Sequence, residues 1–380
     1  MKFNKNLEEN SEMIIQNLDL LDKQLYYGLL GDFKTGYEIG LQLQKERPTC
    51  NRCKFNMGWY ELQFGNLHKG HELLTCGRFE NVFGNRHIGC SQPIWDGKPL
   101  KHPNNFILFN CEGGFGDQII GIRFVKEIVN KYNGRVIVRC SEDLAGLFSN
   151  IPEIHAIITD DTLISPNKNP IHFDYWVPSM SAEYILNLDF NTIPNKSYLT
   201  ISDSYKSFGQ EKIKKNTNKN KKDNKLNVGI RLSGNPQFEH EQHRLFPEEL
   251  LFNVLNKYKD KLNIYSLQKD NTYKLPDYII DLDKDLNSWE NTAGIISNLD
   301  LVISSCTSVA HLSASMGIPT WIVVPILSYY VWAYKLNLDP ISNGEFTSYY
   351  DSARIFRQEK YNDWTHPFNN IELGLKNILI

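Results

Sequence analysis

The stretch CEGGFGDQIIGIRF, residues Cys111 to Phe124, joins an apolar run to a segment with helical spacing. The run before it, FILFN at 106–110, has the length and composition of a buried strand. Gly113, Gly114 and Gly116 stand with Asp117 where this strand should turn into the helix. A cofactor cradle, a catalytic site and a plain tight turn all fit such a junction, and the rest of the chain decides among them.

Strands and helices alternate from about residue 105 onward, and they do so in two blocks. In the first block the pattern predicts strands at 106–110, 135–140 and 154–159, with helices at 117–132 and 144–150. In the second it predicts strands at 226–232, 262–268, 300–305 and 319–325, with helices at 246–259, 291–299 and 308–317. Strands joined through helices at this spacing form βαβ units and parallel sheets. We therefore expect an α/β protein with two Rossmann-like halves and a ligand crevice at the carboxyl ends of their strands.

The two blocks are separated by residues 203–227, a stretch rich in Lys and Asn and low in apolar residues. A segment of this composition buries too little surface to offset the entropy of ordering. It is therefore predicted to be a flexible linker or surface loop. Its lysines are interpreted as a solvated charge run.

The first ninety residues read as helices and contain an internal repeat. Gly31 aligns with Gly65, Phe33 with Leu67 and Gly36 with Gly70, each pair 34 positions apart. A period of about 34 residues is typical of the tetratricopeptide repeat, in which small residues let two helices cross closely. We predict a helical, tetratricopeptide-like segment over 1–90 that packs on the next domain. A helical cap without repeat ancestry is the alternative.

Composition excludes several classes of protein. The chain has 380 residues, 41% of them hydrophobic and 22% charged, with a formal net charge of -3. This is typical of a globular protein and gives no general nucleic-acid footprint. No apolar stretch has the length of about 18 residues that a membrane span needs, and the N-terminus lacks a secretory apolar core. A cytoplasmic location is therefore expected.

Seven cysteines are scattered along the chain, and one close pair, Cys50 and Cys53 in CNRC, suggests zinc or redox chemistry. The following cysteines, Cys76 and Cys90, do not form the second close pair that a four-ligand zinc site needs. Buried thiols are the favoured interpretation, and no metal site is predicted.

The glycine-rich turn at 113–117 does not have the spacing G-x-G-x-x-G, and no acidic residue is placed for a ribose. A dinucleotide cofactor therefore fits poorly. Asp117 falls in the first turn of a predicted helix, where a carboxylate caps exposed N–H groups. On local grounds capping is at least as good an interpretation as catalysis.

The second block carries a polar constellation. Ser233, Gly234 and Asn235 follow a predicted strand, and Thr307 and Ser308 begin a predicted helix. Hydroxyls and free N–H groups at a helix N-terminus suit a phosphate, although an ordinary Ser/Thr cap gives the same pattern. Arg244, in EHEQHR, offers a planar fork that matches phosphate geometry. Zinc at His240 and His243 is not favoured, since no third ligand is suggested.

At this point a resemblance becomes specific. Seven landmarks occur in family order over about residues 90 to 370: WDGKPL (95–100), EGGFGDQIIGIRF (112–124), VGIRLSGNPQF (228–238), HRLFPEEL (243–250), YSLQ (265–268), the long stretch 291–325 and ARIFRQEKYNDW (353–364). The chain resembles tetratricopeptide repeats fused to a glycosyltransferase of family nine, the ADP-heptose:lipopolysaccharide heptosyltransferases, with a more distant similarity to O-GlcNAc transferase.

The resemblance implies a GT-B fold: an acceptor domain at 91–202 and a nucleotide-sugar domain at 228–380 that ends in a C-terminal helix. It implies that Asp117 is the catalytic base and that the turn Gly113, Gly114 and Gly116 lies on the acceptor side. On the donor side it implies binding by these residues: Ser233, Gly234, Asn235, Arg244, Gln268, Thr307, Ser308 and His311. Arg244, Thr307 and Ser308 would meet the diphosphate and Gln268 the base, while helix packing explains His311 about as well. The family is generally metal-independent, so no cofactor beyond the nucleotide sugar is expected.

One departure concerns the donor sugar. The family usually has Asp-Thr-Ser where this chain has Cys306-Thr307-Ser308, and cysteine cannot accept a charged hydrogen bond. This argues against heptose. We predict an inverting transfer of a sugar from a nucleotide sugar to a hydroxyl on a glycan, lipid-linked or protein acceptor, with a possible protein partner on the helices. The alternatives are a repeat scaffold that binds a nucleotide without catalysis, and a transferase acting on a modified nucleic-acid base.

Overall fold

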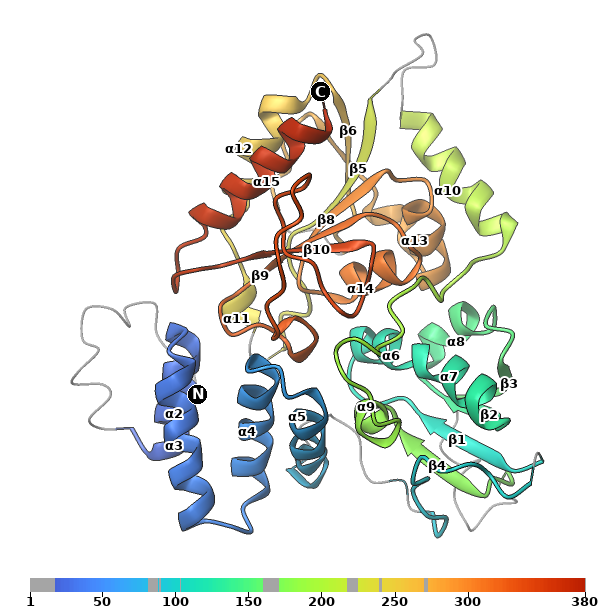
Figure 1. The fold of residues 1–380 in the computed structure, drawn as a ribbon. Helices are drawn as coiled ribbons and strands as arrows, with labels where there is room; N and C mark the ends of the chain where they lie inside the picture. The colour runs from blue at the N-terminus through green and yellow to red at the C-terminus, as the bar shows by residue number, and fades with distance from the viewer. Residues whose placement is uncertain are drawn as a thin grey trace.

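A computed structural model describes residues 18–80, 88, 90–102, 104–159, 171–216, 225–238, 241–269 and 273–379. These residues form three parts: a helical segment, a first α/β domain and a second α/β domain. Figure 1 shows the helical segment in blue beside the first domain in cyan and green, with the second domain, yellow to red, lying across both. Helices, two parallel sheets and their order along the chain confirm the predicted fold class.

The first domain is built on a parallel sheet of four strands in the order β3-β2-β1-β4. The strands are β1 (Phe106–Asn110), β2 (Arg135–Arg139), β3 (Ile154–Ile158) and β4 (Tyr175–Pro178). Its helices are α6 (Phe115–Gly121), α7 (Arg123–Tyr132), α8 (Glu142–Phe148) and α9 (Ala182–Ile185), so the predicted helix 117–132 is two helices that meet at Ile122. Because β1 lies between β2 and β4, the chain order reverses beside it, and the turn after β1 opens at this switch point.

The second domain repeats this design on a larger scale, with the parallel strand order β10-β9-β8-β5-β6-β7. The strands are β5 (Leu226–Arg231), β6 (Leu262–Ser266), β7 (Ile279–Asp281), β8 (Leu301–Ser305), β9 (Thr320–Val324) and β10 (Ala353–Arg357). Its helices are α11 (Glu241–Arg244), α12 (Glu248–Tyr258), α13 (Trp289–Ile296), α14 (Ser308–Ser315) and α15 (Thr365–Ile378). The order is that of a dinucleotide-binding fold, and its switch point lies between β5 and β8.

The helical segment consists of two similar hairpins. They are α2 (Leu20–Leu30) with α3 (Phe33–Glu46), and α4 (Asn51–Gln63) with α5 (Leu67–Leu74), followed by a 3-10 turn at Thr75–Glu80. Gly31 and Gly65 both take left-handed φ angles, 81° and 88°, at the turn between the helices of their hairpin. A methyl group on Gly36 would lie 2.3 Å from the Tyr60 hydroxyl, so this glycine is needed for close helix crossing. The 34-residue correspondence is therefore structural, while membership of the tetratricopeptide family stays a prediction.

The predicted linker is partly wrong. Residues Asp203–Asn216 form a helix, α10, that packs against α13. Gly209 makes this possible, because a methyl group there would lie 1.9 Å from the carbonyl oxygen of Gly294. Ile213 is buried as well. The high Lys and Asn content led to the prediction of a loop, whereas the segment forms a helix that packs through two glycines. Residues 217–224 lie outside the described residues.

A buried polar and aromatic cluster joins the three parts. His71 of α5 lies with its Nε2 3.2 Å from the Tyr349 hydroxyl of the second domain. The same hydroxyl donates to Glu183 of α9 at 3.4 Å. Arg123 of α7 donates to the backbone carbonyl of Tyr349, and its guanidinium carbon lies 4.3 Å from the centre of the Tyr350 ring. The parts are therefore held in one arrangement by contacts that involve all of them.

Burial shifts the titration of two members of this cluster. It raises the pKa of Glu183 to about 7 and lowers the pKa of His71 to about 3. At pH 7 His71 is therefore neutral, while Glu183 is far less ionised than an exposed carboxyl.

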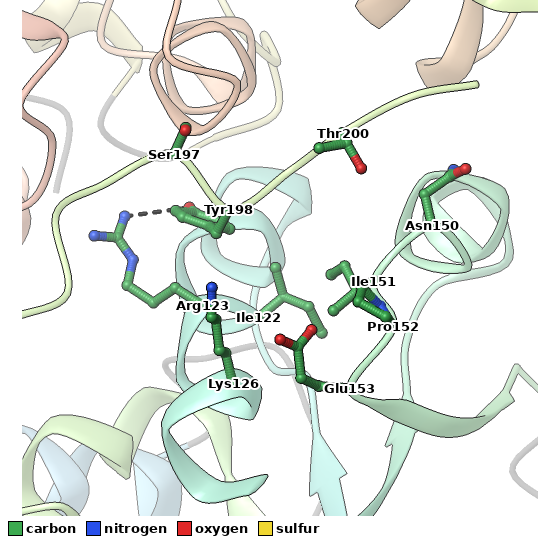
Figure 2. A pocket seen from close by; sticks show the side chains of 10 residues that line it. All are labelled: Ile122, Arg123, Lys126, Asn150, Ile151, Pro152, Glu153, Ser197, Tyr198 and Thr200. Carbon is green, nitrogen blue, oxygen red and sulfur yellow. Dashed lines mark hydrogen bonds between the residues drawn. The ribbon is translucent and has the colours of Figure 1, made fainter. Parts of the chain in front are cut away.

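A cavity of about 180 Å³ lies on the first domain, beside the segment that leads to α10. Figure 2 shows its lining, which includes Lys126 and Glu153, and shows the Arg123 guanidinium bonded to Tyr198. None of the residues predicted to form the site lines this cavity.

All seven cysteines lie in the described part, and none of them forms a disulfide bond there. Cys50 and Cys53 lie with their sulfur atoms 2.8 Å apart at the start of α4. Among the described residues, no helix has both the length and the apolar character that crossing a membrane would require.

Candidate functional site

Asp117 lies at the end of the glycine-rich turn that follows β1. Its Oδ2 accepts the backbone N–H of Gly114 at 2.8 Å, which caps the start of α6. Gly113 has a φ of 75°, and a methyl group there would lie 2.4 Å from the same oxygen. The turn therefore needs glycine at 113 both for its backbone angle and for the space that the carboxylate occupies.

The other carboxylate oxygen of Asp117 faces the second domain. Oδ1 accepts a hydrogen bond from the hydroxyl of Tyr329, in the loop after β9. Burial raises the pKa of Asp117, while the bonds from Tyr329 and Gly114 and the charge of Arg244 lower it in part. Oδ2 of Asp117 therefore caps the helix, while Oδ1 makes the contact with the other domain.

Arg244 is held at the edge of the second domain by three contacts. It forms an ion pair with Glu241 on the same short helix α11, and it donates to the backbone carbonyl of Cys306. Its guanidinium carbon lies 4.8 Å from the centre of the exposed Phe238 ring. A guanidinium held in this way is a preorganised positive charge beside the loop between β8 and α14.

Thr307 and Ser308 lie where β8 passes into α14. Thr307 has the extended backbone of an N-cap residue, but its side chain makes no capping bond, and its hydroxyl lies 3.3 Å from that of Ser304. The first-turn N–H groups of α14 therefore do not bond the Thr307 side chain. A helix start of this kind is suited to an anion.

The turn at 233–235 is braced by Gln268. The Gln268 side-chain oxygen accepts the N–H groups of Leu232 and Ser233, each at 3.2 Å, and its amide donates to the Ser233 hydroxyl at 3.1 Å. Gly234 donates to Glu241 at 2.7 Å, and a methyl group there would lie 2.3 Å from Arg244. Asn235 is exposed. Gln268 is buried and bonded within the protein, so its side chain is a brace for the turn in this structure.

His311 lies inside α14 and is buried. Its ring stacks on Trp332 with the planes 5° apart, and its Nδ1 lies 3.1 Å from the Tyr350 hydroxyl. Burial lowers its pKa to about 3, and the charges of Arg123 and Arg244 act in the same direction. The structure favours packing over donor binding for this residue.

Cys306 is also buried. Its sulfur accepts the indole N–H of Trp332 at 3.0 Å. Burial raises the pKa of the thiol. The Cys306 side chain therefore packs beside the site, and the part of it that meets Arg244 is the backbone carbonyl.

The two domains touch where these residues gather. A methyl group on Gly116 would lie 3.2 Å from the His311 ring and 3.5 Å from the Ser308 α-carbon, so the turn of the first domain lies directly on the start of α14. The turn that ends at Asp117 thus lies beside Ser308 and His311, and the charge of Arg244 acts on the Asp117 carboxylate. Gln268 instead contacts the turn at residues 232 and 233. Figure 1 shows α6 and α14 side by side at this boundary. His240 lies outside the described residues.

Two members of the site were missed by the sequence analysis. Glu241 stands three positions before Arg244 on a helical stretch, a spacing that does indicate an ion pair. Tyr329 carries no local signal, because its partner Asp117 is 212 positions away.

Comparisons with known proteins give distant structural similarities. No family model matches the chain, and no curated protein matches it. Among solved structures, it is similar to ADP-heptose lipopolysaccharide heptosyltransferase II of E. coli, with a TM-score of 0.48, 12% identity, and coverage of 72% of this chain and 98% of that one. A family nine glycosyl transferase of Veillonella parvula gives a TM-score of 0.46, 10% identity, and coverage of 67% and 86%. Heptosyltransferase WaaC of E. coli, solved with ADP, gives 0.41, 12%, and coverage of 72% and 98%. Similarity at this level carries no argument about chemistry, which is taken below from the site itself.

Proposed function

We propose that the protein is an inverting glycosyltransferase that moves a sugar from a nucleotide-sugar donor to a hydroxyl acceptor. The observation that carries the proposal is the meeting of Asp117, from the switch point of one Rossmann-like domain, with Arg244 and the start of α14, from the switch point of the other. In open parallel sheets, ligands bind at such points.

In this proposal Asp117 acts as the general base. Its carboxylate takes the proton of the acceptor hydroxyl while the acceptor oxygen bonds to the anomeric carbon of the donor. The bond between that carbon and the diphosphate oxygen breaks with its electron pair leaving on the diphosphate. Because this is a single displacement, the configuration at the anomeric carbon is inverted.

The negative charge that develops on the leaving diphosphate is met by protein groups. Arg244 supplies a fixed positive charge, and the N–H groups at the start of α14 supply oriented donors. We infer that these groups do the work that a metal ion does in other transferases. Residues 91–202 would then hold the acceptor and 228–380 the donor, as the family resemblance implies, and the protein would work in the cytoplasm on a glycan, lipid-linked or protein acceptor.

The test is a paired assay of donor binding and turnover. Purified protein is screened with UDP-, GDP- and ADP-sugars for thermal stabilisation, and the matching donor at a hundredfold excess over its dissociation constant should add about 2.7 kcal/mol of stability. With that donor, Asp117→Asn should keep the stabilisation and lower turnover about 10²- to 10⁴-fold, the contribution of a general base. Asn keeps the size of the side chain and an oxygen for the Gly114 cap.

Two outcomes would contradict the proposal. Turnover by Asp117→Asn at the wild-type rate would show that Asp117 is not the general base. Tight nucleotide binding by the wild type without any transfer or donor hydrolysis would favour the non-catalytic scaffold instead.

A further inference from the structure

We propose that Tyr329 is the positioning residue of the Asp117 carboxylate, and that the helical segment takes part in the reaction by holding Tyr329 in place through Trp59. This inference rests on the proposed function, since it gives Asp117 the role of base. It assigns to the helices a role in the site itself, in addition to any partner that they bind.

The first step is the pair of contacts on the carboxylate. Gly114 and Tyr329 each donate to a different oxygen of Asp117, so the plane of the carboxylate is fixed from both domains. Burial raises the pKa of the Tyr329 hydroxyl well above its usual range, and the nearby Asp117 charge raises it further. Tyr329 therefore stays protonated and acts as a donor, which leaves Oδ1 a second lone pair for an acceptor hydroxyl.

The second step is the fixing of the loop that carries Tyr329. Arg357 of β10 donates to the Ser328 hydroxyl at 2.9 Å and to the carbonyl of Trp332 at 2.6 Å, so it ties the loop on both sides of Tyr329. Tyr330 is buried directly beside it. A residue placed between such anchors cannot swing freely, which suits a fixed donor.

The third step is the contact with the helices. Trp59 of α4 meets the Tyr329 ring edge to face, with the ring centres 5.7 Å apart. Two glycines of the first hairpin, Gly28 in α2 and Gly31 in the turn after it, lie against the same loop. A methyl group on Gly31 would lie 3.1 Å from Ile326, and one on Gly28 would lie 3.5 Å from Leu327. The helical segment thus lies along the loop 326–329.

The last step is the electrostatic consequence. The charge of Arg244 on α11 lowers the pKa of Asp117, and the charge of Asp117 raises the pKa of the Cys306 thiol. The neutral His311 ring lies against the turn that carries Asp117. Tyr329 stabilises the charged form of Asp117 against the burial that disfavours it. Removing the hydroxyl should therefore raise the pKa of Asp117 and leave less of it ionised at neutral pH.

The experiment compares variants by two independent readouts. The first is the titration of the Asp117 carboxyl, followed by ¹³C NMR of aspartate-labelled protein and assigned by its loss in Asp117→Asn. The second is the pH profile of kcat/KM with the donor found above. Tyr329→Phe is the main variant, and Tyr330→Phe is its matched control, because it removes the same atom one position away, where the hydroxyl lies 4.0 Å from the Met180 sulfur.

Tyr329→Phe should raise the Asp117 pKa by about one unit or more, the effect of losing one hydrogen bond to a charged group. The acidic limb of the kcat/KM profile should move upward with it, and kcat near neutral pH should fall about tenfold with donor affinity unchanged. Tyr330→Phe should leave both readouts unmoved. Trp59→Leu should shift them in the same direction by a smaller amount, and Phe64→Leu, which removes an exposed aromatic ring packed on Tyr37, should shift neither.

Each outcome decides something. An unchanged Asp117 titration in Tyr329→Phe overturns the positioning role, whatever the activity does. A shift in Tyr329→Phe without one in Trp59→Leu overturns the part assigned to the helices. A shifted titration in a protein whose wild type transfers no sugar would leave the positioning intact and contradict the proposed function instead.

Discussion

Two loops reach the same carboxylate, and they are built in opposite ways. The turn after β1, residues 111–117, is short and glycine-rich, and its shape follows from its own sequence: Gly113 needs a positive φ and Asp117 caps the helix that follows. The loop after β9, residues 325–332, is aromatic, and its shape follows from what lies around it, namely Arg357 and the helices that carry Trp59. One loop is fixed by local backbone geometry and the other by tertiary packing.

The contrast shows how the geometry of the site is fixed. The first loop provides the reactive group, and the second provides its orientation from a different domain. Because the bond between Asp117 and Tyr329 exists only when the two domains are together, the ionisation of Asp117 depends on the domain arrangement.

The largest effect is expected from the locally built loop. Gly113→Ala forces a side chain into a left-handed φ, at a cost of about 1–2 kcal/mol, and its methyl group meets the Asp117 carboxylate. Moving that carboxylate by about 1 Å should lower kcat/KM at least about a hundredfold.

Gly114→Ala is the matched control for this prediction. Its φ is −77°, and its methyl group would lie 3.7 Å from Asp117. Steady-state kinetics should therefore show a small change. Equal losses in the two variants would mean that the local geometry of the turn does not govern the site.

The second effect concerns the packing that holds the other loop. Glu183 lies in the cluster joining the helices to both domains, and its folded pKa of about 7 lies above its ordinary value of 4.5. A raised pKa gives stability that is present at low pH and is lost as pH rises through about 7. Glu183→Gln cannot ionise, so its free energy of unfolding relative to wild type should rise by about 2.5 kcal/mol between pH 5 and pH 8.

Urea unfolding at several pH values checks this. Because the His71 Nδ1 lies 3.6 Å from Glu183 Oε2, the comparison is repeated in a His71→Gln background, in which the difference between the two proteins isolates Glu183. Glu249→Gln, on the exposed side of α12, is the charge control. If the free energies of unfolding of Glu183→Gln and wild type changed with pH in parallel, the pKa of Glu183 would not be raised in the folded protein.

The smallest effect tests whether Gln268 binds the nucleotide base, as the family resemblance implies, or only braces the turn at residues 232 and 233. Gln268 braces residues 232 and 233. Gln268→Ala should cost about 1 kcal/mol of stability through the lost hydrogen bonds and should leave the preference among UDP, GDP and ADP unchanged. Gln268→Glu, which keeps the accepting oxygen, should cost less. A changed nucleotide preference would return Gln268 to the role of a base-binding residue.

The same contrast explains what could be read from the sequence. The strands 106–110 and 301–305 and the helix beginning at Ser308 were predictable because periodicity and turn residues are local properties. Asp117, Arg244 and Thr307 could be predicted as candidate site residues because each follows or begins an element of the predicted fold. Three strands were not predicted. The β4 and β7 strands are short and are defined by their neighbours in the sheet, and the stretch that forms β10 was interpreted only as a family landmark.

Tertiary packing explains what the sequence could not show. Helix α10 depends on the contact between Gly209 and Gly294, and His311, for which the sequence left packing and donor binding open, stacks on Trp332 and lies near the Tyr350 hydroxyl. Neither relation joins residues that are close in the sequence. The assignment of Tyr329 had no signal for the same reason.

The central claim is that Asp117 and the phosphate-binding groups of the second domain face one ligand. A crystal structure of the protein with a nucleoside diphosphate tests it most directly. We expect the diphosphate at the start of α14, within hydrogen-bond distance of Arg244 and on the side that Asp117 faces. A diphosphate bound elsewhere, or bound there with the Asp117 side chain turned away from it, would overturn the claim.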